Sequence, residues 1–258
     1  MGAKITSKSL EIILNEAFER HHQKGFIAND PISIPHLFTQ KEDIEIMGFL
    51  VSILSWGQRV TIIKNAHRLI EIFENKPFQF ITQHQDKDLK ACLDFVHRTF
   101  NDTDLLSIIG FLKDLYLNQG GLEQAFSEGV KPKDLNVKNG INQFRKSFEM
   151  SPYFVSRTKK HIAYPDSGSA CKRLNMFLRW MVRKDDKGID FGLWEHIKPS
   201  QLICPLDVHV IRQALKLNLL KEEKTSWENA VYLTERLKKF DPIDPVKYDF
   251  ALFGMGVN

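Results

Sequence analysis

Apolar residues recur every three or four positions along most of the chain, the spacing that places them on one face of a helix. The pattern is clearest in residues 7–24, 42–56, 60–73 and 225–239, and it continues with interruptions through 86–151. Two prolines within residues 30–35 predict an extended linker there. Alternating β-branched runs bounded by hairpin turns are lacking. The sequence therefore predicts an all-α fold.

Composition narrows the class of protein. The chain has 258 residues, of which 43% are hydrophobic and 26% charged, and this suits one domain or two lobes with a packed core. The formal net charge of +4 is mildly basic and compatible with a nucleic-acid partner. No uninterrupted apolar run approaches the ~20 residues that cross a bilayer, so no membrane partner is expected.

Three cysteines, Cys92, Cys171 and Cys204, are scattered along the chain. They cannot supply the four thiolates of an iron–sulfur cluster, so no cluster or other cofactor is expected. They form no disulfide framework either, which fits a reducing, cytoplasmic location. His21 and His22 point in different directions on a helix because they are adjacent, so no metal site is expected from them.

A turn followed by a helix is predicted in residues 165–183. Asp166, Gly168 and Ser169 are turn and N-cap residues, and the helix after them carries Lys172 and Asn175 one turn apart. A Gly-containing turn before a helix can point backbone N–H groups at an anion such as a phosphate. Spacing alone favours the simpler interpretation, an ordinary capped helix with a solvated lysine.

A second helix start is predicted in residues 204–220. Pro205 and Asp207 precede an apolar series formed by Val208, Ile211 and Leu215. Aspartate is a favoured N-cap, so a capping carboxylate is the default interpretation. The functional alternative is an ionised carboxylate that stabilises positive charge developing in a reaction.

Together the two segments resemble the helix-hairpin-helix DNA glycosylase superfamily. Gly168, Lys172 and the run Phe177-Leu178-Arg179 match the first half of that family's pattern. Pro205, Asp207, His209, Val210 and Arg212 match its second half. The lysine segment is most similar to the 8-oxoguanine glycosylase/AP lyase branch, and the whole chain looks like a bacterial group of glycosylase-like proteins.

Two departures from the family pattern concern the nucleophile. Ala170 stands where the second hairpin glycine is expected, and alanine tolerates a positive φ less well. Asp207 follows Lys172 by 35 residues, about twice the interval of several glycosylases but comparable to that of an archaeal 8-oxoguanine branch. Similarity to that branch would align its lysine better with Asn175, one turn later, so the aspartate is the more secure of the two assignments.

A helix junction earlier in the chain carries a second part of the resemblance. Residues 53–59 read Ile-Leu-Ser-Trp-Gly-Gln-Arg and resemble the Leu-Ser-x-Gln segment of the superfamily. The resemblance implies that Gln58 lies beside the target base or fills the gap it leaves, and that Arg59 contacts DNA nearby. A polar junction anchored by Trp56 is the alternative.

The resemblance also implies an architecture. Residues 43–184 would form one helical lobe ending in the hairpin and the lysine helix. Residues 1–42 and 185–258 would form the other, which carries the aspartate helix. Lys172 and Asp207 would then lie on opposite walls of a cleft that receives DNA.

The implied activity is base excision from double-stranded DNA by a monomeric glycosylase, with an oxidised purine as the first lesion to test. Asp207 would stabilise the sugar cation, and Lys172 would attack the sugar to form a Schiff base in an AP lyase step. Gly168, Ser169, Asn175, His209 and Arg212 would contact DNA or the base. Two alternatives remain: a non-catalytic helix-hairpin-helix DNA-binding protein, and a helical protein of unrelated function.

Overall fold

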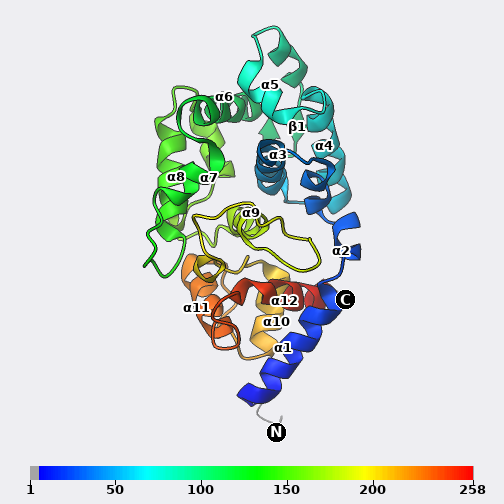
Figure 1. Ribbon diagram of the computed structural model, residues 1–258, viewed down its shortest axis with the longest axis vertical. Helices are drawn as coiled ribbons and strands as arrows, with labels where there is room; N and C mark the ends of the chain where they lie inside the picture. Colours follow the sequence, from blue (N-terminus) through cyan, green and yellow to red (C-terminus); the bar gives the residue numbers. More distant parts are fainter. Residues whose placement is uncertain (1–5, 258) are drawn as a thin grey trace. The chain divides into compact units, whose positions relative to one another are not determined.

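The computed structural model describes residues 6–257, and their secondary structure is almost entirely helical (Figure 1). This confirms the all-α class. The α-helices are α1 (Ser7–His21), α2 (Gly25–Ala28), α3 (Lys41–Leu54), α4 (Arg59–Ile72), α5 (Pro77–Gln83), α6 (Asp102–Asn118), α7 (Gly121–Ser127), α8 (Lys138–Met150), α9 (Lys172–Val182), α10 (Val208–Lys216), α11 (Trp227–Leu237) and α12 (Tyr248–Val257). The 3-10 helices are η1 (Pro31–Ser33), η2 (Pro35–Leu37), η3 (Asp88–Cys92), η4 (Ser156–His161), η5 (Pro165–Ser167), η6 (Pro199–Gln201) and η7 (Pro245–Lys247).

Two short segments differ from the sequence prediction. Residues 96–101 form a β-hairpin from β1 (Val96–His97) and β2 (Phe100–Asn101), which is too short to produce a period-two pattern. The expected extended linker at 30–35 is instead wound into η1 and η2. Each of these turns begins with a proline, because a proline at the first helical position loses no hydrogen bond.

The described residues divide into two compact units. The first contains residues 6–26, 133–137 and 164–257, and the second contains 27–132 and 138–163. The expected boundary at residue 184 is therefore wrong for the lysine helix, since α9 belongs to the same unit as α10. Backbone hydrogen bonds explain the difference. Phe191 donates to the carbonyl of Trp180, and Leu193 donates to that of Met181, so α9 and the chain after it are tied together.

The second unit is built on α3, in which every residue from Ile44 to Leu54 is buried. Phe144 of α8 stacks on Phe126 of α7 with ring centroids 4.0 Å apart. It also meets Phe49 of α3 and Phe111 of α6 edge to face, at 5.5 and 5.6 Å. These aromatic contacts join four helices that are distant in sequence into one core.

The first unit packs α12 against both α1 and α10. Within it, Phe177 of α9 meets Trp194 edge to face at 5.3 Å, so the segment after α9 covers that helix. None of the helices in residues 6–257 combines the length and the apolar content needed to cross a membrane.

Candidate functional site

Lys172 and Asp207 lie side by side in the first unit. Lys172 is the first residue of α9 and Asp207 is the N-cap of α10. Lys172 Nζ is 3.8 Å from Asp207 Oδ2, and the two side chains are 31% and 20% exposed. The expected approach of the amine to the carboxylate is therefore present, and both groups are partly exposed to solvent. Both residues belong to one unit, however, and not to two different lobes.

The two carboxylate oxygens of Asp207 have different partners. Oδ1 accepts the backbone N–H groups of His209 at 2.9 Å and Val210 at 3.0 Å, which caps α10. Oδ2 faces the Lys172 ammonium. The capping interpretation and the functional interpretation of the sequence are therefore compatible, because the cap fixes the orientation of the oxygen that remains exposed.

The turn before α9 is held at both ends. Gly168 has a φ of +79° and is open to solvent, and its carbonyl accepts the backbone N–H of Trp227 at 3.1 Å. Ser169 forms a β-bridge with Ser226. The expected strain at Ala170 falls instead one residue later, where Cys171 has a φ of +49°. A left-handed non-glycine residue costs about 1–2 kcal/mol, and Cys171 turns the chain directly into Lys172.

Asn175 serves the turn rather than an open site. It is 1% exposed, and its Nδ2 donates to the carbonyl of Ala170 at 2.9 Å. Its Oδ1 is buried without a hydrogen-bond partner among residues 6–257. A buried amide cannot act as a nucleophile. The geometry therefore favours Lys172 over Asn175 as the candidate nucleophile.

His209 and Arg212 differ in accessibility although both lie on α10. His209 Nδ1 donates to the carbonyl of Gly256 at 3.2 Å, and its ring meets Phe253 edge to face. This contact holds α10 against α12. Arg212 is exposed, so it is the member of this pair that can reach a phosphate.

Gln58 and Arg59 belong to the second unit and are both exposed. Gln58 is the N-cap residue of α4 but makes no capping bond through its side chain. The junction behind it is braced: His97 Nε2 donates to the carbonyl of Trp56 at 3.2 Å, and the Arg98 guanidinium lies 4.7 Å from the Trp56 ring centroid. The amide of Gln58 is thus presented to solvent on a fixed loop.

Asp249 was not identified from the sequence, although it is the single charged residue in the apolar run Tyr248–Phe253. It lies in the first turn of α12, where its Oδ2 accepts a hydrogen bond from Arg179 of α9. Burial raises the pKa of Asp249 to about 6, and the negative charge of Asp207 adds to this, while Arg179 and Lys172 oppose it. Asp249 is therefore electrostatically coupled to the Lys172–Asp207 pair.

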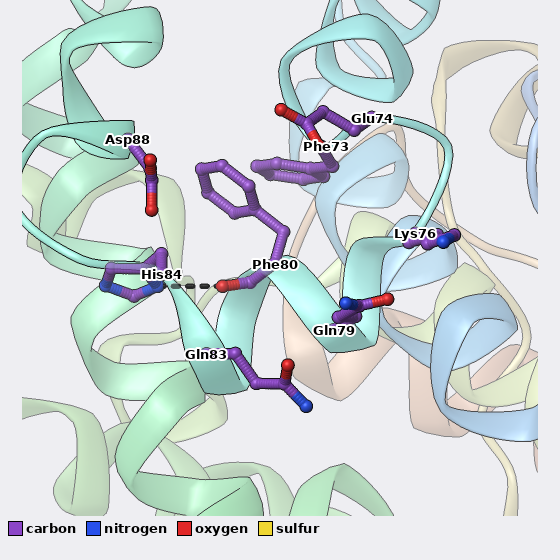
Figure 2. A pocket seen from close by; sticks show the side chains of 8 residues that line it. All are labelled: Phe73, Glu74, Lys76, Gln79, Phe80, Gln83, His84 and Asp88. Carbon is purple, nitrogen blue, oxygen red and sulfur yellow. Dashed lines mark hydrogen bonds between the residues drawn. The ribbon is translucent and has the colours of Figure 1, made fainter.

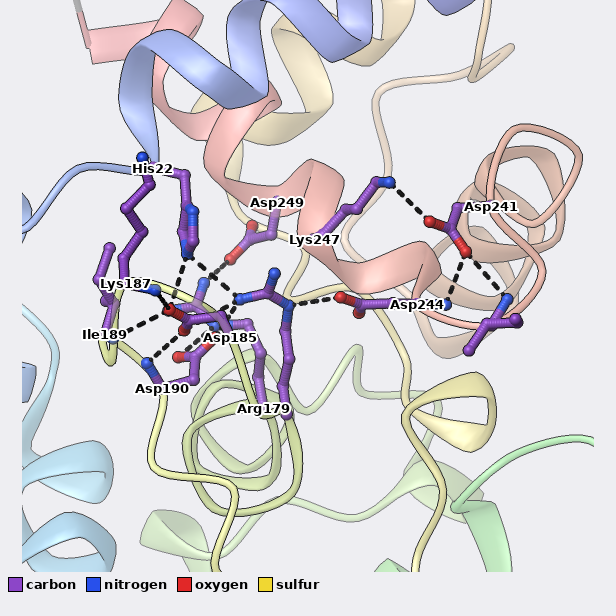
Figure 3. A network of polar contacts seen from close by, with 12 residues as sticks. His22, Arg179, Asp185, Lys187, Ile189, Asp190, Asp241, Asp244, Lys247 and Asp249 are labelled. Atoms are coloured by element: carbon purple, nitrogen blue, oxygen red, sulfur yellow. Dashed lines mark hydrogen bonds and ion pairs between the residues drawn. The ribbon is translucent and has the colours of Figure 1, made fainter.

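A network of buried ions joins α9 to the loop after it (Figure 3). Arg183 bridges Asp190 at 3.0 Å and Asp244 at 2.7 Å. Asp185 accepts backbone N–H groups of the loop and is paired with His22 at 3.3 Å. Burial opposes ionisation of Asp185, but the His22 hydrogen bond and these N–H groups outweigh it and hold the pKa of this carboxyl well below its usual range.

One group in this network has the composition of a metal site. Ligand atoms of His22, Asp185 and Asp186 lie within 4.8 Å of one another. The oxygens of Asp185 already accept hydrogen bonds, however, and the Arg183 guanidinium is 3.5 Å from His22 Nε2. A fixed positive charge at that position disfavours a second cation, so the three residues form an ion-paired clamp and do not fit a metal.

Comparison with known proteins gives a family but no activity. No curated protein and no solved structure matches the chain. One family matches residues 30–258, which runs from the turns before α3 to the end of the chain. Because this match covers most of the sequence, the chain belongs to the family described as Protein of unknown function (DUF2400).

Proposed function

We propose that this chain is a DNA glycosylase of the helix-hairpin-helix type, which excises a damaged base from duplex DNA and cleaves the strand through a lysine Schiff base. The observation that carries the proposal is the 3.8 Å approach of Lys172 Nζ to Asp207 Oδ2 between two helix starts, with both groups partly exposed to solvent. The turn at 165–171, with positive φ at Gly168 and Cys171, corresponds to the hairpin in this proposal.

The carboxylate has a role in the first step. When the bond between the sugar and the base breaks, the base leaves with the bonding electrons and the sugar becomes a cation. An oriented carboxylate stabilises this charge most effectively when it needs no reorganisation. Asp207 meets that condition, since Oδ1 is fixed by the cap and Oδ2 is directed to one side.

The amine has a role in the second step. A neutral lysine nitrogen attacks the anomeric carbon, loses its proton, and forms a Schiff base as the sugar ring opens. Loss of a proton from the sugar carbon next to the Schiff base then forms a C=C bond and expels the phosphate on the following carbon, which breaks the strand. The base must leave the stack before either step, because the sugar is inaccessible in an intact duplex. Gln58 and Arg59 would support the opened duplex, and the exposed Arg212 would contact a phosphate.

Borohydride trapping on duplexes that each carry one damaged base tests the proposal, with oxidised purines first. We expect wild-type protein to form a trapped adduct with at least one lesion, and Lys172→Ala to form none. Asp207→Asn keeps a good cap but removes the charge, and should slow base release roughly a hundredfold. Lys216→Ala, which removes an exposed lysine from α10, is the matched control and should react like wild type.

Three results would contradict the proposal in different ways. Equal trapping by wild type and Lys172→Ala would show that another amine is the nucleophile. Salt-dependent duplex binding without reaction on any lesion would identify a non-catalytic DNA-binding protein. Absence of salt-dependent binding would favour a helical protein of unrelated function.

A further inference from the structure

A cavity of about 270 Å³ opens between the end of α4, the helix α5 and the turn η3, wholly within the second unit (Figure 2). Its aromatic wall is a ladder of three rings. Phe73 and Phe80 lie 4.9 Å apart, and Phe80 stacks on His84 at 5.6 Å. His84 Nδ1 donates to the carbonyl of Phe80 at 2.9 Å, which fixes the imidazole in place. The ring planes are tilted by 36° and 29°, and Phe73 is fully buried behind the other two, so Phe80 and His84 form the accessible part of this ordered aromatic wall.

Charged groups border this wall. The carboxylates of Glu74 and Asp88 and the ammonium of Lys76 all line the cavity. Among the residues that the structure describes, Glu74 and Lys76 have no side-chain partner. Asp88 uses one oxygen, Oδ2, to accept the backbone N–H of Gln85 at 2.9 Å. The nearby Lys113 ammonium is held by the carbonyl of His84 at 3.0 Å. The cavity thus offers two carboxylates that are not neutralised by local ion pairs.

The backbone turns left-handed at Glu74, where α4 ends and the Asn75 N–H donates back to the carbonyl of Ile70 at 3.0 Å. Glu74 has a φ of +53° and the next residue, Asn75, has a φ of +59°. Asparagine adopts this region readily, but glutamate does not, and glycine would remove a cost of about 1 kcal/mol at Glu74. The turn that ends α4 therefore places Glu74 at the rim of the cavity.

We propose that this cavity binds a guanidinium group. A planar cation can lie against aromatic ring faces while its N–H groups donate to carboxylates, and guanidinium satisfies both conditions. The side-chain oxygens of Gln79 and Gln83, one turn apart on α5, add neutral acceptors. The volume is just below that of sites for drug-sized ligands, so the occupant is about the size of one amino acid. Lys76 would meet the carboxylate of free arginine.

Calorimetric titration of the full chain tests the proposal, with arginine as the first probe and citrulline as its neutral isostere. We expect arginine to bind saturably and citrulline to bind at least tenfold more weakly. Glu74→Gln and Asp88→Asn keep the side-chain size and should each weaken arginine binding about tenfold, the effect of one charge-assisted hydrogen bond. Glu71→Gln removes an exposed carboxylate from the same end of α4 without touching the cavity, and should change nothing.

Further probes distinguish the source of the guanidinium. If N-acetyl-arginine amide binds as tightly as arginine, the group comes from a peptide; if only arginine binds, Lys76 selects the free amino acid. The variant Glu74→Gly separates binding from folding, since it should abolish binding without lowering the unfolding temperature. Equal binding of arginine and citrulline, no saturable binding, or an equal effect of Glu71→Gln and Glu74→Gln would overturn the proposal. None of these results depends on DNA repair activity.

Discussion

Asp249 makes the stability of the folded protein depend on pH in a direction that is unusual for an aspartate. Its pKa is raised from 3.8 to about 6 because it is buried, and the neighbouring Asp207 charge acts in the same direction. Between these two values the folded chain holds a proton that the unfolded chain releases. The free energy of unfolding therefore falls as the pH rises through this window.

The size of the effect follows from the shift. A difference of roughly two pKa units at 1.36 kcal/mol each gives about 3 kcal/mol over the whole window. About 2 kcal/mol of this falls between roughly pH 4.5 and 7, where unfolding is accessible to experiment. Asp249→Asn removes the titrating group and keeps an acceptor for Arg179. The unfolding free energy of wild type minus that of the variant should therefore decline by this amount between the two pH values.

Urea unfolding followed by circular dichroism at several pH values measures this difference. Asp241→Asn is a control of opposite sign. Burial opposes ionisation of Asp241, but the Lys247 hydrogen bond and backbone N–H groups outweigh it and lower its pKa. Wild type should therefore gain stability over Asp241→Asn as the pH rises. The quantity to follow is the unfolding free energy of wild type minus that of Asp249→Asn. If this difference stays constant or increases with pH, the assignment of a raised pKa to Asp249 is refuted.

Three other perturbations have defined outcomes. Gly57→Ala should lower the free energy of unfolding by about 1–2 kcal/mol, because Gly57 has a φ of +98° and the new Cβ would lie 2.8 Å from Arg98 Nη1. The control Gly25→Ala places its Cβ in open space and should leave the stability unchanged; thermal unfolding measures both variants. Asp104→Ala should lower the free energy of unfolding by about 3–5 kcal/mol, since this fully buried carboxylate binds Thr158 and His161. A smaller decrease, measured by urea unfolding, would contradict that role. The three buried cysteines should react with a thiol reagent only after unfolding, because burial raises the pKa of each thiol. Rapid labelling of the native protein at about pH 8 would contradict this prediction.

Local signals in the sequence identified the elements that carry the candidate site. The apolar spacing predicted α9 and α10, and the preference of aspartate for the N-cap placed Asp207 at the start of α10. The resemblance to glycosylases then paired Asp207 with Lys172, and the structure shows the two groups 3.8 Å apart. Whether they act on DNA stays a prediction.

Long-range and strained features were not visible in the sequence. Asp249 meets Arg179 across 70 residues, and no local pattern encodes that contact. The left-handed residue of the turn was expected at Ala170 but is Cys171. A glycine usually marks such a position in the sequence, and without a glycine the position can be located only approximately. The boundary of the first unit was misplaced because the hydrogen bonds that tie α9 to residues 191–193 form after a reversal of the chain.

The packing of α1 on α12 has a consequence during synthesis. The Tyr248 hydroxyl donates to Asn15 Oδ1 at 2.9 Å across 233 positions, and the His21 ring occupies the space that a side chain at Gly254 would need. At ordinary elongation rates the first helix leaves the ribosome roughly 10–50 s before its partner exists. Its apolar stripe of Leu10, Leu14 and Ala17 must be shielded over that interval. Until residues 248–257 have been made, α12 cannot cover this stripe, and α1 lacks the helix it packs against in the folded unit.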